Sequence, residues 1–190
     1  MNSKNVFATL ALLLVPALAF AHPGHDESGL VAGISHPLGG LDHLLAMLAV
    51  GLWAAQQKGA ARWALPCTFV GTMLLGGLLG FEGLQLPALE SAIAASVFAL
   101  GLAVALVVRP PLFMAMAATA LFAMFHGIAH GLELPEMSSP WGYATGFVAA
   151  TAALHAVGYA AVRFLPTAAA PMVRITGALS AATGVWLFAG

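Results

Sequence analysis

Long uninterrupted apolar runs are the feature that most limits how this chain can fold. Of its 190 residues, 61% are hydrophobic and only 7% are charged, whereas about 25% of residues are charged in soluble domains. The apolar residues fall into runs of about 20, the length that a helix needs to cross the roughly 30 Å hydrocarbon core of a membrane. The sequence therefore predicts an all-α, polytopic membrane helix bundle. The six predicted spans are 36–56, 63–81, 91–108, 112–131, 141–165 and 173–189.

The N-terminus has the pattern of a signal peptide. Lys4 precedes an apolar core over residues 6–20, and Ala19-Phe20-Ala21 at its end matches the Ala-x-Ala pattern of a cleavage site. This arrangement is typical of a cleaved secretory signal. We expect residues 1–21 to be removed, so that residues 22–190 form a single transmembrane domain. An uncleaved anchor helix is the alternative, although Pro16 and the small residues before the cleavage site favour cleavage.

The charged residues indicate how the predicted spans are oriented. Basic residues are enriched in cytoplasmic loops of membrane proteins. Here the basic residues follow spans one, three and five; they are Lys58, Arg62, Arg109, Arg163 and Arg174. The acidic residues follow spans two and four; they are Glu82, Glu90, Glu133 and Glu136. This distribution predicts a multi-pass protein of the bacterial inner membrane with both mature termini in the periplasm. The net charge of −1 gives no basic surface for nucleic acid.

Two stretches place ionisable side chains inside apolar runs. His36, Asp42 and His43 stand at the start of the first span, and His126 and His130 near the end of the fourth. In the predicted orientation both sets lie in the outer half of the membrane, with Asp42 and His43 about 9 to 11 Å deeper than His36. The spacings of four and seven residues put His126 with His130, and His36 with His43, on common helix faces.

Ionisable groups in a membrane cost roughly 2.5 to 3.5 kcal/mol each on insertion scales, so they usually mark an ion site, a pathway or a proton relay. The alternative is that each imidazole only hydrogen-bonds a neighbouring helix, and this alternative stays most open for the isolated His155 on the fifth span. Pro37 and the glycines after it indicate a loosened first turn, a pattern of broken helices that line a cavity.

The residue types favour a divalent transition metal. Imidazoles with a carboxylate suit Ni(II), Co(II), Zn(II) or Cu(II), whereas Mg(II) and Ca(II) prefer oxygen ligands. With a single cysteine, Cys67, Cu(I) is less favoured, and it is kept open only by methionines that more often serve as packing residues. These methionines are Met47, Met114, Met116 and Met124.

The two stretches also resemble the motifs of the HupE/UreJ family, the hydrogenase and urease accessory nickel permeases. His36, Asp42 and His43 match a pattern of His, five residues, then Asp-His, within surroundings that include Pro37, Gly39 and Met47. Phe125 to Glu133 match Phe-His-Gly-x-Ala-His-Gly-x-Glu. The resemblance covers essentially the whole chain and implies uptake of nickel, in some members cobalt, for metalloenzyme assembly without an ATPase.

We therefore expect a permease that passes Ni(II) or Co(II) across the lipid bilayer, with no prosthetic group and no enzymatic activity. The expected metal-site residues are His22, His25, His36, Asp42, His43, Glu82, His126, His130, Glu133 and His155. His22 and His25 would recruit the ion, Glu82 and Glu133 would attract it to the mouth, and His155 would be a later station or a proton acceptor.

Two other functions stay open at this point. An intramembrane metallohydrolase is one, but Gly127 stands where H-E-x-x-H enzymes have their general base. A metal chaperone or sensor that binds without transporting is the other. Because neutral imidazole is the metal-binding form, we expect uptake to weaken as the pH falls through the region near 6.5, which a pH series of initial uptake rates would measure.

Overall fold

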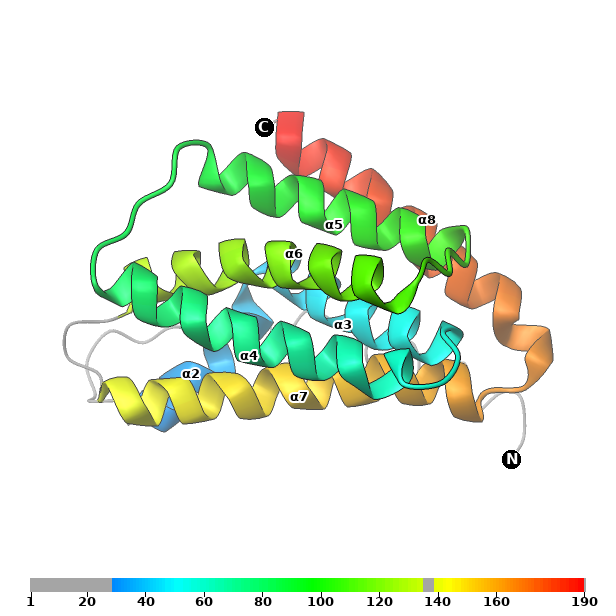
Figure 1. Cartoon of the computed structure of the whole chain (residues 1–190), viewed down its shortest axis with the longest axis horizontal. Coiled ribbons are helices and arrows are strands. Elements are labelled where there is room, and N and C mark those ends of the chain that lie inside the picture. Colours follow the sequence, from blue (N-terminus) through cyan, green and yellow to red (C-terminus); the bar gives the residue numbers. More distant parts are fainter. Residues whose placement is uncertain (1–28, 135–138, 190) are drawn as a thin grey trace.

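Every described element of the protein is a helix (Figure 1). The computed structural model describes residues 29–134 and 139–189, and the predicted signal peptide, His22 and His25 lie outside this part. The helices are α2 (Gly29–Gly39), α3 (Leu41–Gln56), α4 (Ala61–Phe81), α5 (Leu89–Ala105), α6 (Leu112–Leu132), α7 (Pro140–Phe164), the short 3-10 helix η1 (Thr167–Ala169) and α8 (Ala170–Ala189). The all-α prediction is confirmed for these residues, among which there is no strand.

Four helical segments are long and apolar enough to cross a membrane, namely α4, α6, α7 and the η1–α8 segment. Helices α2 and α3 qualify together as one bent span, whereas α5 is apolar but only 17 residues long. Large apolar side chains such as Phe113 and Trp186 are 72% and 67% exposed, as expected where lipid replaces water. The structure therefore supports four or five spans, and the third predicted run corresponds to the shorter α5.

The first predicted span is not one continuous helix. It divides at Gly40, whose backbone is extended (φ −94°, ψ 119°), and α2 and α3 meet at an angle of 84°. Pro37 in the last turn of α2 and the two following glycines explain why the helix ends here. The expectation that His36 and His43 share one helix face through their spacing of seven is therefore wrong.

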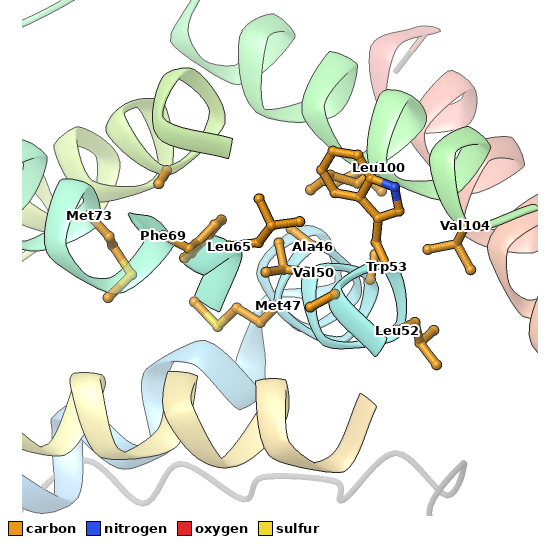
Figure 2. Packing of buried hydrophobic residues seen from close by; sticks show 14 of the residues in the cluster. Ala46, Met47, Val50, Leu52, Trp53, Leu65, Phe69, Met73, Leu100 and Val104 are labelled. Atoms are coloured by element: carbon orange, nitrogen blue, oxygen red, sulfur yellow. The ribbon is translucent and has the colours of Figure 1, made fainter. Parts of the chain in front are cut away.

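Helix α3 forms the centre of the hydrophobic core (Figure 2). Its Met47 and Val50 are fully buried, as are Phe69 of α4 and Val104 of α5. Helix α7 packs along the same helix, because Gly158 brings its backbone against Leu48. Helices of both halves of the chain are thereby packed around α3, whose first turn carries Asp42 and His43.

The two ends of the bundle carry opposite charges. At one end, Arg109 Nε donates to the carbonyl of Gln56 and Arg174 Nε to that of Ala105, each at 2.8 Å. Cations are favourable at helix C-termini, where carbonyls have no partner in the helix. Glu82 follows the last residue of α4 at the opposite end (Figure 1). The charge separation expected from the sequence is thus present along the bundle axis.

Close helix packing depends on particular glycines, which gives a first prediction. A Cβ on Gly76 of α4 would lie 2.6 Å from the carbonyl oxygen of Met124 on α6, whereas a Cβ on Gly71 of the same helix would meet nothing within 4 Å. We expect Gly76→Ala to destabilise the protein by about 1 to 3 kcal/mol, because α4 and α6 must separate. Gly71→Ala is the matched control and should leave the melting temperature in detergent at or above the wild-type value. Equal melting temperatures for the two variants would contradict this account of the α4–α6 contact.

Candidate metal site

The ends of three helices bring four histidine rings together. His36 comes from the last turn of α2, His43 from the first turn of α3, and His126 and His130 from the C-terminal part of α6. The ring centres are 4.1 Å apart for His43 and His130, 4.8 Å for His43 and His126, and 4.9 Å for His36 and His130. The bend at Gly40 positions these rings, since it turns the axis of α2 away from that of α3 while the last turn of α2 stays beside the end of α6.

We call His36, His130 and Glu133 the outer group, because Glu133 follows the last residue of α6. One ligand atom of each residue lies within 4.8 Å of the others. His36 Nε2 and Glu133 Oε2 are 3.0 Å apart. The hydrogen bond from His36 lowers the pKa of the Glu133 carboxyl below its ordinary value of 4.5, and partial burial opposes this effect. Glu133 is therefore a carboxylate at any pH at which imidazole binds metals.

The lowered pKa of Glu133 predicts a pH-dependent contribution to stability. A carboxyl group with a lowered folded-state pKa stabilises the fold above its unfolded pKa, and this contribution is lost as the pH falls through the folded value. The melting temperature of wild type should exceed that of Glu133→Gln by a few degrees at most at pH 6, since half-exposed pairs contribute about 1 kcal/mol or less. The difference should shrink as the pH is lowered below 4.5. A difference that stays constant down to pH 3.5 would show that the pair does not stabilise the fold.

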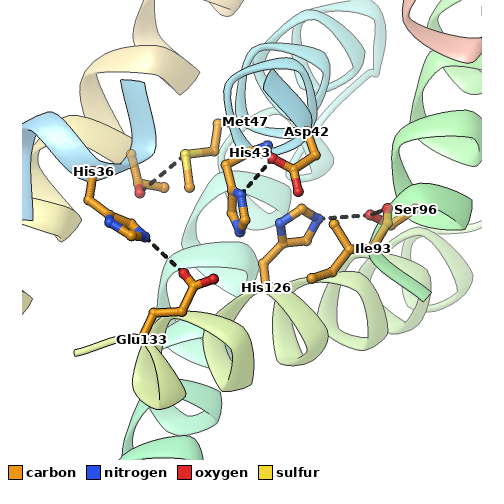
Figure 3. A network of polar contacts seen from close by, with 9 residues as sticks. His36, Asp42, His43, Met47, Ile93, Ser96, His126 and Glu133 are labelled. Carbon is orange, nitrogen blue, oxygen red and sulfur yellow. Dashed lines mark hydrogen bonds and ion pairs between the residues drawn. The ribbon is translucent and has the colours of Figure 1, made fainter. Parts of the chain in front are cut away.

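We call Asp42, His43 and His126 the inner group (Figure 3). Asp42 Oδ1 accepts two hydrogen bonds from His43, one from its backbone N–H and one from its ring Nδ1, both at 2.8 Å. The position of Asp42 in the first turn of α3 suits a carboxylate, because a helix N-terminus carries partial positive charge. On the other side, His126 Nε2 lies 2.8 Å from the hydroxyl of Ser96 on α5.

Several of these ring nitrogens are buried without a hydrogen-bond partner among the described residues. They are His43 Nε2, His126 Nδ1 and both nitrogens of His130. Buried polar atoms are nearly always hydrogen-bonded, so a cluster of exceptions calls for a bound species or water. Unpartnered imidazole nitrogens beside two carboxylates are a suitable donor set for a divalent transition metal.

A pocket of about 450 Å³ reaches both groups. Its wall includes Gly39 and Gly40 at the helix break, together with His36, Asp42, His43 and Glu133. The last carbonyl groups of α2 have no following helical turn to donate N–H groups to them, and helix ends of this kind favour cations. Glu90, in the first turn of α5, also lines the pocket. The sequence patterns did not indicate Glu90 as a site residue, because only the packing of α5 brings it to this wall.

Two expected site residues lie apart from this cluster. His155 of α7 is 3% exposed, and both of its ring nitrogens lack partners among the described residues. The ring of Phe69 is next to it at 5.2 Å and is 6.0 Å from that of His126. His155 is thus near the inner group but separated from it by an apolar ring. Glu82 is exposed at the end of α4 and does not line the pocket.

Three of the four methionines considered as thioether ligands, Met47, Met114 and Met116, lie in the hydrophobic core or on the outside of the bundle. Met47 Sδ accepts a hydrogen bond from Thr151 Oγ1 at 3.4 Å within the core. Met116 packs against the same core, and Met114 is 51% exposed on the outside of the bundle. This arrangement favours packing roles for these side chains over a thioether site for Cu(I).

The helices and the pocket define a multi-pass membrane protein with a cluster of imidazoles and carboxylates at one end of the bundle. The sequence matches the HupE / UreJ protein family over residues 10–187. It is also 45% identical to Protein HupE of Rhizobium leguminosarum bv. viciae in an alignment that covers 100% of both chains. No solved structure matches the chain significantly. The chain belongs to the HupE/UreJ family, so the resemblance inferred from the two histidine motifs is confirmed.

Proposed function

We propose that this protein is an inner-membrane permease for a divalent transition-metal ion, with nickel favoured and cobalt as the alternative cargo. The observation that carries the proposal is the set of buried, unpartnered imidazole nitrogens that adjoin a carboxylate-lined pocket. Membership of the HupE/UreJ family supports nickel in particular, and with it a role in supplying urease or hydrogenase maturation.

The proposed topology has a signal peptide cleaved after Ala21, six membrane crossings and both mature termini in the periplasm. In this topology the bent α2–α3 pair and the short α5 each count as one crossing. The support is that Arg109 and Arg174 cap helices at one end of the bundle, while Glu82 and Glu133 follow helices at the other. By the positive-inside rule the acidic end, with the pocket, faces the periplasm.

The proposed path begins at the periplasmic end. His22 and His25 recruit the ion and Glu82 attracts it by charge. The outer group then binds it, followed by the inner group. The next station is His155, which the ion reaches by displacement of the Phe69 ring. Each station must leave part of the coordination shell to water or to the next station, because a fully closed site would retain the ion.

Reconstitution into liposomes tests the function directly. Purified protein in liposomes with a negative-inside potential should accumulate radioactive nickel with time, well above protein-free liposomes. Competition by cobalt, zinc and copper would rank the cargo. Stoichiometric binding without accumulation would instead identify a chaperone or sensor. Peptide cleavage that depends on tightly bound zinc would identify a metallohydrolase. Neither binding nor accumulation would reject the proposal.

A further inference from the structure

Ser96 connects α5 to the histidine cluster, although neither histidine motif includes it. The residue is fully buried, and its hydroxyl makes two contacts. Oγ donates to the carbonyl oxygen of Ile93 at 2.7 Å, and it lies 2.8 Å from His126 Nε2. A carbonyl oxygen can only accept, so the contact with Ile93 uses the single proton of the hydroxyl.

This arrangement determines which ring nitrogen of His126 carries the hydrogen. Since the Ser96 hydroxyl gives its proton to Ile93, its oxygen must accept from His126, and Nε2 carries the hydrogen. In a neutral imidazole the other nitrogen, Nδ1, then has a free lone pair. Nδ1 is buried without a partner among the described residues and is turned toward His43 (Figure 3). A second hydrogen, on Nδ1, would be a buried N–H without an acceptor among the described residues.

His43 shows the complementary arrangement. The Asp42 carboxylate is only an acceptor, so His43 Nδ1, at 2.8 Å, carries the hydrogen. His43 Nε2 therefore has the lone pair, and it too is buried without a partner among the described residues. The two rings are 4.8 Å apart and nearly perpendicular, at 85°. In each ring the protonated nitrogen thus donates to an acceptor on the side away from the other ring, to Asp42 from His43 and to Ser96 from His126.

We propose that Ser96 is a positioning residue that fixes His126 in the Nε2–H tautomer, so that the inner group binds its ion through His126 Nδ1 and His43 Nε2. The inference rests on the proposed function for the identity of the ion, but the tautomer is a property of the metal-free protein. In other metal sites, residues that hydrogen-bond the non-ligating nitrogen of a histidine ligand orient the ring and fix its tautomer. Their loss typically lowers metal affinity by about 10-fold to 100-fold.

A purely structural role for Ser96 makes different predictions. If the hydroxyl only satisfies the Ile93 carbonyl or fills space, its removal changes stability and leaves the proton of His126 in place. If it fixes the tautomer, Ser96→Ala leaves Nε2–H without an acceptor, and the ring is free to carry its hydrogen on Nδ1, which blocks the ligand nitrogen. Ser96→Thr keeps a hydroxyl and should keep the tautomer.

The test combines ¹⁵N NMR with metal binding on the full chain in lipid. Histidine-labelled protein without metal should give a protonated Nε2 and an unprotonated Nδ1 for His126, whose signals are identified by their loss in His126→Asn. Ser96→Ala should mix the two tautomers and weaken Ni(II) binding in equilibrium dialysis by about 10-fold to 100-fold. Ser180→Ala removes another buried serine hydroxyl, on α8, and is the control expected to match wild type.

The outcomes separate this inference from the proposed function. A wild-type His126 protonated on Nδ1 overturns the inference whether or not any variant folds. Unchanged tautomer and affinity in Ser96→Ala also overturn it, even if the wild type transports nickel. If wild-type protein neither binds nor transports nickel, the proposed function fails, while the NMR result still decides whether Ser96 fixes the tautomer.

Discussion

Replacing His130 by alanine is expected to lower the initial rate of nickel uptake about tenfold or more. The ring of His130, a member of the outer group, is 4.9 Å from that of His36 and 4.1 Å from that of His43 in the inner group, so it connects the two groups. Both of its nitrogens are free among the described residues. Its removal therefore takes a ligand from the outer group and interrupts the transfer of the ion to the inner group. Uptake into liposomes at matched protein content measures the effect.

Loss of folding must be excluded as the cause of this effect. Leu121→Ala also shortens a side chain of α6, but Leu121 is 54% exposed on the outside of the bundle and should tolerate the change with normal uptake. The His130→Ala protein should elute as a single species in detergent, as wild type does. Normal uptake by a well-folded His130→Ala protein would remove this residue from the proposed path.

Local spacing explains why part of the cluster was predictable from the sequence. His126 and His130 lie on one continuous helix, where a separation of four residues places two side chains on the same face. Asp42 and His43 are adjacent in the chain, and their contact requires only the first turn of α3. Relations over such short distances are set by helix geometry, which holds whatever the rest of the bundle does.

Relations between helices were not predictable in the same way. His36 contacts Glu133, 97 positions along the chain, because the chain bends at Gly40 and α2 packs along α7 with its last turn at the end of α6. Pro37 and the glycines indicated a loosened turn, but neither the angle nor its direction follows from their presence. Sequence spacing gave the wrong reason for placing His36 and His43 in one cluster, since the two residues lie on separate helices and both approach His130.

Ser96 and Glu90 show a second kind of limit. Both are on α5, which carries no histidine motif, and each reaches the site only through the packing of α5 against α3 and α6. A serine inside an apolar run is common and usually bonds its own backbone, as Ser96 also does with Ile93. Its contact with His126 depends on the rotation of α5 about its axis, which a nearly uniform apolar sequence leaves undetermined.

Removal of the Asp42 carboxylate is expected to reduce uptake as strongly as the loss of His130. In Asp42→Ala the His43 ring loses the acceptor that holds its hydrogen on Nδ1, and the inner group loses its negative charge. Both changes lower the affinity for a cation. The first does so because the ligand ring is no longer held in its orientation, and the second because a favourable charge is lost. Nickel affinity by equilibrium dialysis and uptake into liposomes should therefore fall together, by about tenfold or more.

Asp42→Asn separates these two contributions, because an amide oxygen can still accept from His43 but carries no charge. If orientation dominates, the Asn variant should retain most of the wild-type nickel affinity while the Ala variant loses it. If charge dominates, the two variants should be equally impaired. Asp42 is only partly buried, at the edge of the pocket, so neither substitution should prevent folding. Wild-type affinity and uptake in a folded Asp42→Ala protein would show that the ion does not use the inner group.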